Sequence, residues 1–257
     1  MAQYALDRVL SIAGTYAADN SKKEITAGDV AFLCDQVTDP SLSFTSETED
    51  IVDARNNVVM VLENGRGATF GASNAFFNTQ LLAAQTGGKV VDAAGVAFTK
   101  YDILTLGEGG VATLTVATEA TSADVYKLEK DNSLTTASKV AGTIADGKVT
   151  VTGLAVGDRV LVVYTAKVSE GEHITALADG TNELMNVTAE VLLRELCNEE
   201  LYYAYIIMKG KLSGEAEWSM TRDGNHAFEL RCMPSYCEDP RKLVEVIIVK
   251  GEDLIGA

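Results

Sequence analysis

Alternation of apolar and polar residues is the clearest pattern in the C-terminal third of the chain. Ala216, Trp218 and Met220 interleave with polar residues, and the alternation returns over residues 228–232. A period of two residues is typical of β-strands that bury one face. The Asp-Gly dipeptide at 223–224 favours a tight turn between the two segments. The pattern therefore predicts a β-hairpin.

Two almost continuous apolar segments flank this hairpin, at residues 202–208 and 243–249. They are rich in Ile, Val and Tyr, a composition that is typical of strands covered on both faces. Each segment must be buried, either by the chain's own fold or by a neighbouring subunit. A further strand is predicted at 187–193, leading into a turn at 197–200.

The N-terminal third predicts a second pair of strands. Residues 42–53 form a predicted strand whose second half is acidic, and residues 58–62 form a returning apolar strand. We expect the chain to reverse at Asn56 and Asn57. The glycine-rich stretch from Gly65 to Gly71 is interpreted as the connection that follows these strands.

One helix is predicted with both of its ends, over residues 75–85. Ser73 or Asn74 is the expected N-cap. Helical spacing places Phe77 and Leu81 on one face, and the helix should end at Gly87 and the glycine after it.

Residues 90–179 are rich in Thr, Val, Ala and Gly and indicate a small sandwich-like insert. Their Val/Thr alternation with glycine turns resembles many immunoglobulin-like modules. The predicted domains are a core of residues 1–89 and 180–257 and a β-rich insert of residues 90–179. Short strands of the insert are predicted at 112–117, 124–129, 148–153 and 158–167.

The chain is strongly acidic. Its 257 residues include 21 Lys and Arg against 37 Asp and Glu, which gives a formal net charge of −16. Tight nucleic-acid binding is excluded as a function class, because such a surface repels phosphate groups. Lys22-Lys23 and Arg241-Lys242 are isolated basic pairs, so no basic patch is expected.

Hydropathy predicts a globular protein with a sizeable core, since 47 % of the residues are hydrophobic. No apolar segment reaches the roughly 20 residues that span a bilayer. The N-terminus places Asp7 and Arg8 where a signal peptide would be apolar. We therefore expect a protein that is made and folded in a cytoplasm.

Motifs for catalysis or cofactor binding are weak. The spacing of Gly65, Gly67 and Gly71 does not fit a nucleotide-binding loop. Neither His173 nor His226 neighbours a Ser or Cys in a nucleophile motif, and His226 is interpreted as a turn or strand-end residue. The sequence predicts no enzyme activity, no cofactor and no metal.

The four cysteines, Cys34, Cys197, Cys232 and Cys237, are too irregularly spaced for a disulfide scaffold or a zinc site. Buried thiols are the expected state. Cross-links between subunits are the alternative if the protein ends up outside a cell.

Paired glutamates stand two residues apart, at Glu47 with Glu49 and at Glu215 with Glu217. Each pair points to one face of its strand, an arrangement typical of a solvated acidic face. A glycosidase would also use two carboxylates. It would need aromatic sugar platforms, however, and the only Trp is Trp218, on the opposite face from the glutamates that flank it.

The order of these elements is similar to that of the tail tube protein of tailed bacteriophages. The segments that carry the resemblance are Leu201–Gly214, the hairpin strands from Trp218 to Leu230, and Leu243–Val249. Residues 71–77 and 81–87 likewise resemble the single helix of that family.

The resemblance implies a mainly-β fold of two packed antiparallel sheets, a sandwich or barrel, with one flanking α-helix and the β-rich insert. Six subunits would form a ring, and rings would stack into a hollow tube. Pairing of strand edges between subunits would cover the long apolar strands. The expected inter-subunit residues are Tyr203, Tyr205, Ile207, Val246 and Ile248. The loop expected to reach the adjacent ring is Asp53, Ala54, Arg55, Asn56 and Asn57.

The implied function is passive transport in the virion tail, which is assembled in the host cytoplasm. DNA would leave the capsid through the tube, and an acidic bore would repel it within a Debye length of about 8 Å. Alternation favours Glu47, Glu49, Glu215 and Glu217 as bore-facing acids. Expected partners are further copies of the chain, the tape measure, tail terminator and baseplate proteins, and a sheath if the tail contracts. No membrane partner is expected.

Two other function classes remain open. One is another virion component, such as a sheath, decoration or baseplate protein. The other is an immunoglobulin-like adhesion or surface-layer module, which predicts an export signal that the N-terminus does not contain. A hydrolase would need a cleft with a perturbed His or carboxylate, and no such motif is predicted.

Overall fold

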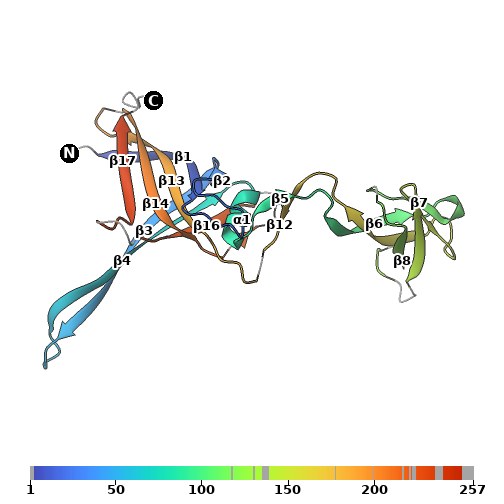
Figure 1. Cartoon of the computed structure of the whole chain (residues 1–257), viewed down its shortest axis with the longest axis horizontal. Coiled ribbons are helices and arrows are strands. Elements are labelled where there is room, and N and C mark those ends of the chain that lie inside the picture. The colour runs from blue at the N-terminus through green and yellow to red at the C-terminus, as the bar shows by residue number, and fades with distance from the viewer. Residues whose placement is uncertain are drawn as a thin grey trace. The chain divides into compact units, whose positions relative to one another are not determined.

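The computed structural model divides into two compact units, Met1–Val90 with Ile174–Ala257, and Val91–His173. Antiparallel strands build both units, and the described residues contain one α-helix. The predicted mainly-β class with one helix is confirmed (Figure 1). The structure describes residues 3–116, 118–129, 131–134, 139–176, 178–198, 200–215, 217–219, 221, 224–234 and 240–250.

The first unit is organised by one hydrogen-bonded sheet, which has nine strands in the described part of the chain. The order is β2-β1-β13-β14-β16-β4-β3, with β15 paired to β16 and β17 paired to β14. The strands are β1 (Tyr4–Tyr16), β2 (Val30–Cys34), β3 (Val37–Val52), β4 (Val58–Asn74), β13 (Leu184–Glu195), β14 (Leu201–Leu212), β15 (Glu217–Trp218), β16 (His226–Cys232) and β17 (Val244–Lys250).

This sheet folds over so that its two ends pack against each other. Three strands separate β2 from β16 in the hydrogen-bonded order, yet Phe32 of β2 and Phe228 of β16 meet edge to face, with ring centroids 5.7 Å apart. The two packed layers are therefore halves of one continuous sheet. Buried side chains from β1, β2, β4, β13, β14, β16 and the helix fill the space between them.

The predicted C-terminal hairpin is present as a strand pair. In β16, Phe228, Leu230 and Cys232 are buried, and Glu229 and Arg231 are exposed, as the alternation indicated. Glu217–Trp218 pairs with Ala227 and His226. Ala216, Met220 and Asp223 lie outside the described residues, so the turn stays a prediction.

The glycine stretch was interpreted wrongly as a connection. Residues 65–71 lie within β4, which continues to Asn74 in register with both β3 and β16. Glycine at 67 has a steric reason, because a Cβ atom there would lie 2.8 Å from Oγ1 of Thr45. The alternating Ala68, Phe70 and Ala72 face the core, so the tertiary ladder decides the conformation of this glycine-rich segment.

The helix α1 (Thr79–Thr86) begins later than predicted. Its N-cap is Asn78, whose side-chain oxygen accepts from the Leu81 N–H at 3.0 Å, rather than Ser73 or Asn74. Both of those residues are held in β4. The predicted C-terminal glycine is confirmed, since Gly87 has a φ of 68° and its N–H donates to the Ala83 carbonyl.

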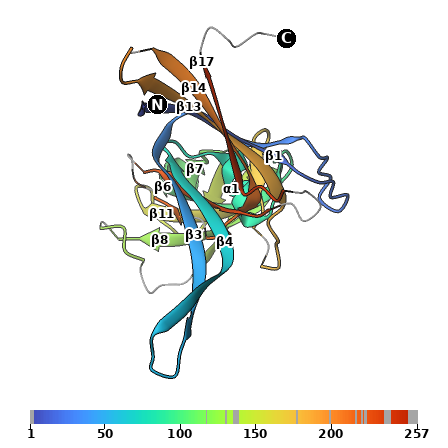
Figure 2. The same cartoon turned by 90° about the vertical axis from the view of Figure 1, so that its left-hand side faces the viewer.

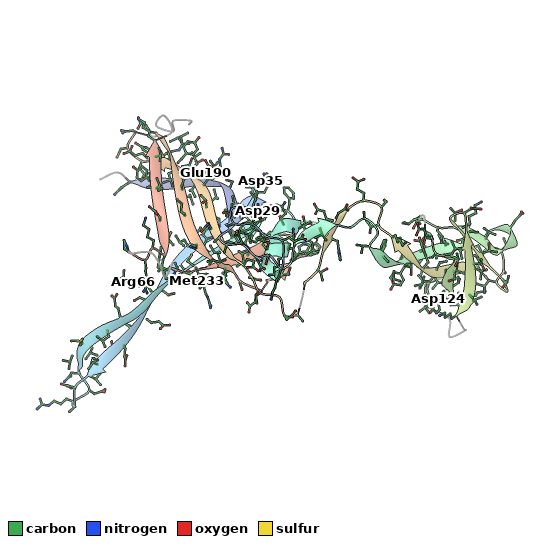
Figure 3. The ribbon with its side chains drawn as sticks, viewed as in Figure 1. Asp29, Asp35, Arg66, Asp124, Glu190 and Met233 are labelled. Atoms are coloured by element: carbon green, nitrogen blue, oxygen red, sulfur yellow. The ribbon has the colours of Figure 1, made fainter. Side chains whose placement is uncertain are left out.

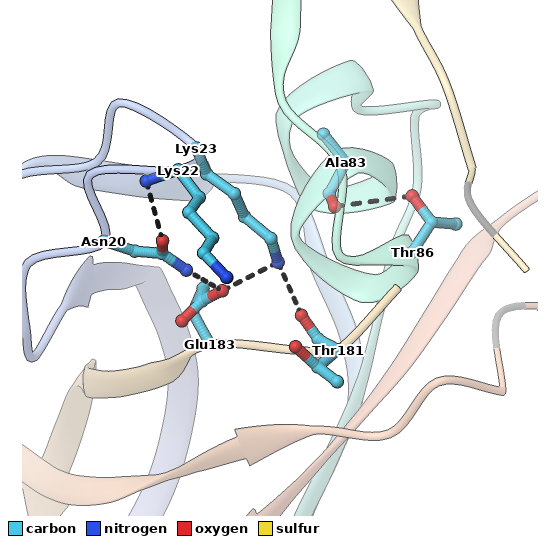
Figure 4. Close-up of polar contacts among 7 residues, drawn as sticks. All are labelled: Asn20, Lys22, Lys23, Ala83, Thr86, Thr181 and Glu183. Atoms are coloured by element: carbon cyan, nitrogen blue, oxygen red, sulfur yellow. Dashed lines mark hydrogen bonds and ion pairs between the residues drawn. The ribbon is translucent and has the colours of Figure 1, made fainter. Parts of the chain in front are cut away.

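A polar cluster fastens the loop after β1 to the segment before β13 (Figure 4). Glu183 accepts from the Lys23 ammonium at 2.7 Å and from the Asn20 amide at 2.9 Å. Lys23 also donates to the Thr181 carbonyl at 2.7 Å. Burial acts to raise the pKa of Glu183, but these two donors outweigh it and the pKa lies below its ordinary value.

The second unit contains a six-stranded antiparallel sheet in the order β6-β11-β8-β9-β10-β7. Four of its strands coincide with the predicted segments, whereas β6 and β9 were missed, because neither shows a clear alternation. The strands are β6 (Ala97–Thr105), β7 (Val111–Thr113), β8 (Ser122–Leu128), β9 (Val140–Ala145), β10 (Lys148–Val151) and β11 (Arg159–Lys167). A 3-10 turn, η1 (Glu108–Gly110), precedes β7, and β5 (Val90–Asp92) pairs with β12 (Glu172–Ile174).

A buried carboxylate joins the two end strands of this second sheet. Asp102 of β6 accepts from the backbone N–H of Thr115, just after β7, at 2.8 Å and from its hydroxyl at 2.5 Å. The Tyr164 hydroxyl donates to the same carboxylate at 2.9 Å. Burial acts to raise the pKa of Asp102, but these bonds and the nearby Lys100 hold it below the ordinary range. The sheet thereby curls around its own apolar core.

Replacing Asp102 with Ala should destabilise the second unit by about 3 kcal/mol, because three donors, including the buried Tyr164 hydroxyl, lose their acceptor. Trp218, the only Trp, lies in the first unit, so its fluorescence follows that unit alone while circular dichroism follows both. We expect Asp102→Ala to lower the melting temperature by circular dichroism and not by Trp fluorescence. The control is Asp131→Ala, at an exposed position. Equal shifts of the melting temperature in the two variants would contradict the proposed role of Asp102 in joining β6 to the segment after β7.

Candidate assembly surfaces

A long hairpin, here called the arm, comprises residues 46–64 of β3, β4 and the turn between them. It extends beyond the rest of the first unit (Figures 1 and 2). In its turn, Asp53 accepts from the backbone N–H groups of Asn57 (2.9 Å) and Arg55 (2.8 Å), and these bonds lower its pKa. Asn56 has a φ of 65°. The predicted reversal of the chain at Asn56 and Asn57 is confirmed.

The two strands of the arm differ in chemistry. Glu47, Glu49 and Asp50 stand on β3, whereas Val58–Leu62 of β4 is apolar at every position. The side chains of Val58–Leu62 are 38–67 % exposed, and consecutive residues point to opposite faces. A two-stranded ribbon alone is marginally stable in water, and exposed apolar surface of this extent marks an interaction site. The arm is therefore a candidate interaction surface.

A second uncovered surface lies on β14 and β17, which pair from Tyr202–Lys250 to Met208–Val244. Among the described strands, β17 pairs only with β14, so its other edge carries unpaired backbone groups. Val246 and Ile248 point to one face of β17 and Ile247 to the other, and all three are more than two-fifths exposed. The chain's own fold does not cover this strand.

The predicted inter-subunit residues divide between the two faces of this surface. Tyr203, Tyr205 and Ile207 lie on one face, and the register places Val246 and Ile248 on the other. The Tyr205 hydroxyl donates at 3.4 Å to Glu190 of β13, which is labelled in Figure 3. A partner that binds β17 would therefore contact exposed side chains on either face or pair with the open edge of the strand.

The predicted acidic pairs lie in different parts of the sheet. Glu215 and Glu217 line an open hollow of about 600 Å³ together with Glu229. Glu47 and Glu49 lie on the arm. Glu47 pairs with residue 65 of β4, whereas Glu217 lies in the row of residue 73, and this separation of eight residues corresponds to roughly 25 Å. One chain does not bring the two pairs together.

Small polar residues cover the outward face of the sheet between these acids. Residues 41–45 of β3 and 67–73 of β4 present only Ser, Thr and Gly on the side opposite the core. Sequence reasoning missed this face because the glycine stretch was interpreted as a connection. The alternation of small polar residues and glycines with Ala68, Phe70 and Ala72 is the sequence pattern that indicates this face. The outward residues are Ser41, Ser43, Thr45, Gly67, Thr69, Gly71 and Ser73.

The expectation that basic residues form only isolated pairs is wrong. The register places Lys211 of β14 directly opposite Arg231 of β16, and Lys209 stands two residues before Lys211 on the same face. Lys209 and Lys242 line one hollow of about 190 Å³. Strand pairing brings together cations that are distant in sequence. The cationic row, as it is called below, comprises Lys209, Lys211 and Arg231 on the outward face of the sheet.

His226 is the first residue of β16, which agrees with its interpretation as a strand-end residue, and its side chain is buried. Its Nε2 lies 2.7 Å from Oε1 of Gln85, whose amide donates to the Ala227 carbonyl. Phe77 stacks on both Trp218 and His226, with ring centroids 4.0 and 5.8 Å away. Burial lowers the pKa of His226. His226 is thus held neutral.

The remaining candidate chemistry is structural. Burial raises the pKa of the Cys34 thiol to about 12 and also raises that of Cys232, so both are inert core residues. Cys197 is exposed, and Cys237 lies outside the described residues. The part of the chain described contains no cluster of His, Cys, Asp or Glu arranged to hold a metal. None of its helices is long and apolar enough to cross a membrane.

Taken together, the surfaces define a β-rich structural subunit that leaves two apolar strand surfaces for a partner to cover. A family model agrees with this class. Residues 13–239 match the model of the YomU/Tube protein family, and the chain belongs to that family. The resemblance to phage tail tube proteins is confirmed, and the chain is a structural component of the virion tail. No curated protein matches the sequence.

Acidification should destabilise the packing of His226 against Gln85 and Phe77. The unfolded histidine takes up a proton below a pKa of about 6.5, while the folded one resists it. The contribution to stability is therefore present above that pH and is lost as the pH falls toward the lower folded value. Between pH 7 and 5 we expect urea denaturation, followed by Trp218 fluorescence, to show a loss on the order of 1 kcal/mol.

The control for this prediction is His226→Gln, which keeps a donor for Gln85 and does not titrate. Its unfolding free energy should change less between pH 7 and 5 than that of the wild type. The same pH dependence in both proteins would show that His226 is not the responsible group.

Proposed function

We propose that the chain is the repeating subunit of a hollow tube, made of stacked hexameric rings, through which viral DNA passes into the host. The observation that carries this proposal is the pair of uncovered apolar strand surfaces, the arm and β17, at different places on one chain. Two different surfaces that meet between copies give a head-to-tail contact, which closes into rings or continues as a filament.

Within such a ring, the open edge of β17 and the exposed faces of β14 and β17 are the inter-subunit surface, including Tyr203, Tyr205, Ile207, Val246 and Ile248. Strand pairing with a neighbour satisfies the unpaired groups of the β17 edge. The turn from Asp53 to Asn57, at the end of the arm, is the part that reaches an adjacent ring. The tape measure, tail terminator and baseplate proteins, and a sheath in a contractile tail, are the further partners.

The bore is formed by the outward face of β3 and β4. Ser, Thr and Gly side chains give this face low relief and no cation along residues 41–45 and 67–73. Glu215 and Glu217, with Glu229, add negative charge beside it. A surface that offers phosphate groups no counter-ion lets DNA slide past, since protein–DNA affinity comes largely from Lys and Arg contacts. Glu47 and Glu49 stand on the arm and have a different environment.

Electron microscopy of the purified full-length chain tests the assembly. We expect hexameric rings and tubes of uniform diameter, because the apolar surfaces of the arm and β17 cannot both remain in water at high concentration. Sedimentation should show that the subunit population falls as concentration rises. A protein that stays monomeric at millimolar concentration would contradict the proposed function.

Charge reversal of Glu215 and Glu217 to Lys tests the bore. Tubes should form, but DNA ejection from virions carrying the variant should slow by about tenfold, because cations in the bore attract phosphate. The matched control is Glu108→Lys with Glu170→Lys, which adds the same charge to exposed positions of the second unit. Ejection at wild-type rates from both variants would remove Glu215 and Glu217 from the bore.

A further inference from the structure

The cationic row lies on the outward face of two neighbouring strands. Lys211 of β14 stands directly opposite Arg231 of β16, and Lys209 precedes Lys211 by two residues on the same face. The residues that alternate with Lys211 and Arg231 are buried, so both cations point away from the core. Lys211 and Arg231 are exposed, and Lys209 is half-buried. The three side chains therefore present their charges to solvent on one side of the sheet.

The backbone holds this row in place. Gly210 lies between the two lysines, at a point where β14 and β16 approach each other closely, since a Cβ atom there would collide with the Arg231 carbonyl oxygen. Gly210 pairs with Cys232, which is a core residue. Because the close approach and the buried partner both fix the register, Lys211 stays opposite Arg231.

The arrangement is unfavourable for an isolated chain. Like charges directly opposite each other on neighbouring strands destabilise a sheet. Within the described part of the chain, no carboxylate forms an ion pair with Lys209, Lys211 or Arg231. Lys211 contributes to lowering the pKa of Glu183, but the ion pair of that carboxylate is with Lys23, at 2.7 Å. A bound anion would remove the repulsion between the paired cations.

The cationic row continues the face of hydroxyls and glycines on β3 and β4. Arg231 pairs with Thr69, which in turn pairs with Ser43, so one line across the sheet contains Ser43, Thr69, Arg231 and Lys211. Hydroxyl groups together with Lys and Arg are the side chains that contact phosphate oxygens of DNA. A strand face of low relief does not enter a groove, where base edges are read. The chemistry of this line therefore fits a sugar-phosphate backbone without regard to base sequence.

We propose that the cationic row is a weak phosphate contact for duplex DNA that passes through the tube. Lys211 and Arg231 bind phosphate oxygens through charge-assisted hydrogen bonds, and Lys209 extends the contact by about 7 Å along the strand. This proposal rests on the proposed function, because it takes the adjoining face of β3 and β4 as the wall of the bore. Glu229 stands two residues before Arg231 on the same face and limits the attraction, so the DNA is able to move on.

An acidic protein segment is the competing ligand for the cationic row. Protein interfaces have a well-packed centre from which water is excluded. The residues of β3 and β4 that adjoin the row on this face are Ser, Thr and Gly, which provide no such centre. Exposed ion pairs alone contribute little to binding in water. DNA needs no apolar contact, because its affinity for Lys and Arg comes largely from the release of counter-ions. Duplex DNA therefore fits the row better than an acidic protein does.

Fluorescence anisotropy with a labelled duplex DNA tests the contact, using the full chain at concentrations below those that give tubes. The row variant carries Lys209→Gln, Lys211→Gln and Arg231→Gln. We expect weak binding by the wild type at low salt and binding about tenfold weaker by the row variant, because three phosphate contacts are lost. The slope of the logarithm of the binding constant against that of the salt concentration should fall by about 2.7, which is about 0.9 for each contact.

Two controls separate the position of the charges from their number. Arg8→Gln with Lys22→Gln and Lys148→Gln removes the same kinds of cation from other exposed positions, and this variant should keep the wild-type affinity and slope. A variant in which both lysines of the row become Arg and its arginine becomes Lys keeps the charge in place and should also bind as the wild type does. Circular dichroism establishes that each protein is folded.

Ejection from virions tests whether the contact acts on moving DNA. Virions that carry the row variant should eject their DNA on the order of twofold faster than wild-type virions at low salt, because fewer cations hold the phosphates. The difference should disappear at high salt, where counter-ions compete for the same phosphates. Equal rates at low salt, from virions with complete tails, would overturn the role of the row in DNA passage.

The remaining outcomes are distinct. Equal affinity of the row variant and the exposed-site control for duplex DNA overturns the phosphate contact, whereas tubes seen by electron microscopy still support the proposed function. A labelled polyglutamate peptide that binds the wild type as tightly as the duplex does, and loses affinity for the row variant, makes the row a protein-binding surface and also overturns it. A wild-type protein that forms neither rings nor tubes contradicts the proposed function, and with it the place of the row beside a bore.

Discussion

The structure depends on one constraint, which is that every apolar strand must be covered and every strand edge must be paired. The first unit meets it for its central strands by folding one continuous sheet over, so that Phe32 and Phe228 meet although three strands separate them in the sheet. The same sheet continues past the core in two directions, as the arm and as β17. There, a single chain has nothing left to pack against the apolar residues. The proposed assembly would cover the apolar residues where the sheet extends beyond its own core.

The features that could be predicted from the sequence are those set by local chemistry. Asp53 to Asn57 forms a turn because the aspartate accepts from the backbone of the residues that follow, and the alternation from Phe228 to Cys232 records a half-buried strand. The start of the helix and the glycine stretch were interpreted wrongly. Asn74 is a good N-cap by propensity, but its pairing with Val37 and His226 holds it in a strand. Tertiary hydrogen bonds outweigh a local preference of about 1 kcal/mol.

The candidate surfaces also divide into those that can be predicted from the sequence and those that only the fold brings together. The acidic pairs and the apolar strands are continuous in sequence and were visible there. The cationic row is assembled from β14 and β16, and nothing short of the register reveals that Lys211 lies opposite Arg231. The net charge of −16 therefore conceals an uneven distribution, with an acidic arm and a cationic row on one unit.

The second unit resolves the same constraint differently. Its sheet curls until β6 and β7 come together, and the Asp102 carboxylate joins them through Thr115 and Tyr164. The buried side chains of this unit form a cluster of their own. Its core is thereby complete within one chain, whereas the first unit leaves apolar side chains of the arm and β17 exposed. A unit whose sheet closes on itself does not change which residues pair in the nine-stranded sheet of the first unit. This explains how a β-rich module can lie between β4 and β13 without interrupting the sheet that those strands share.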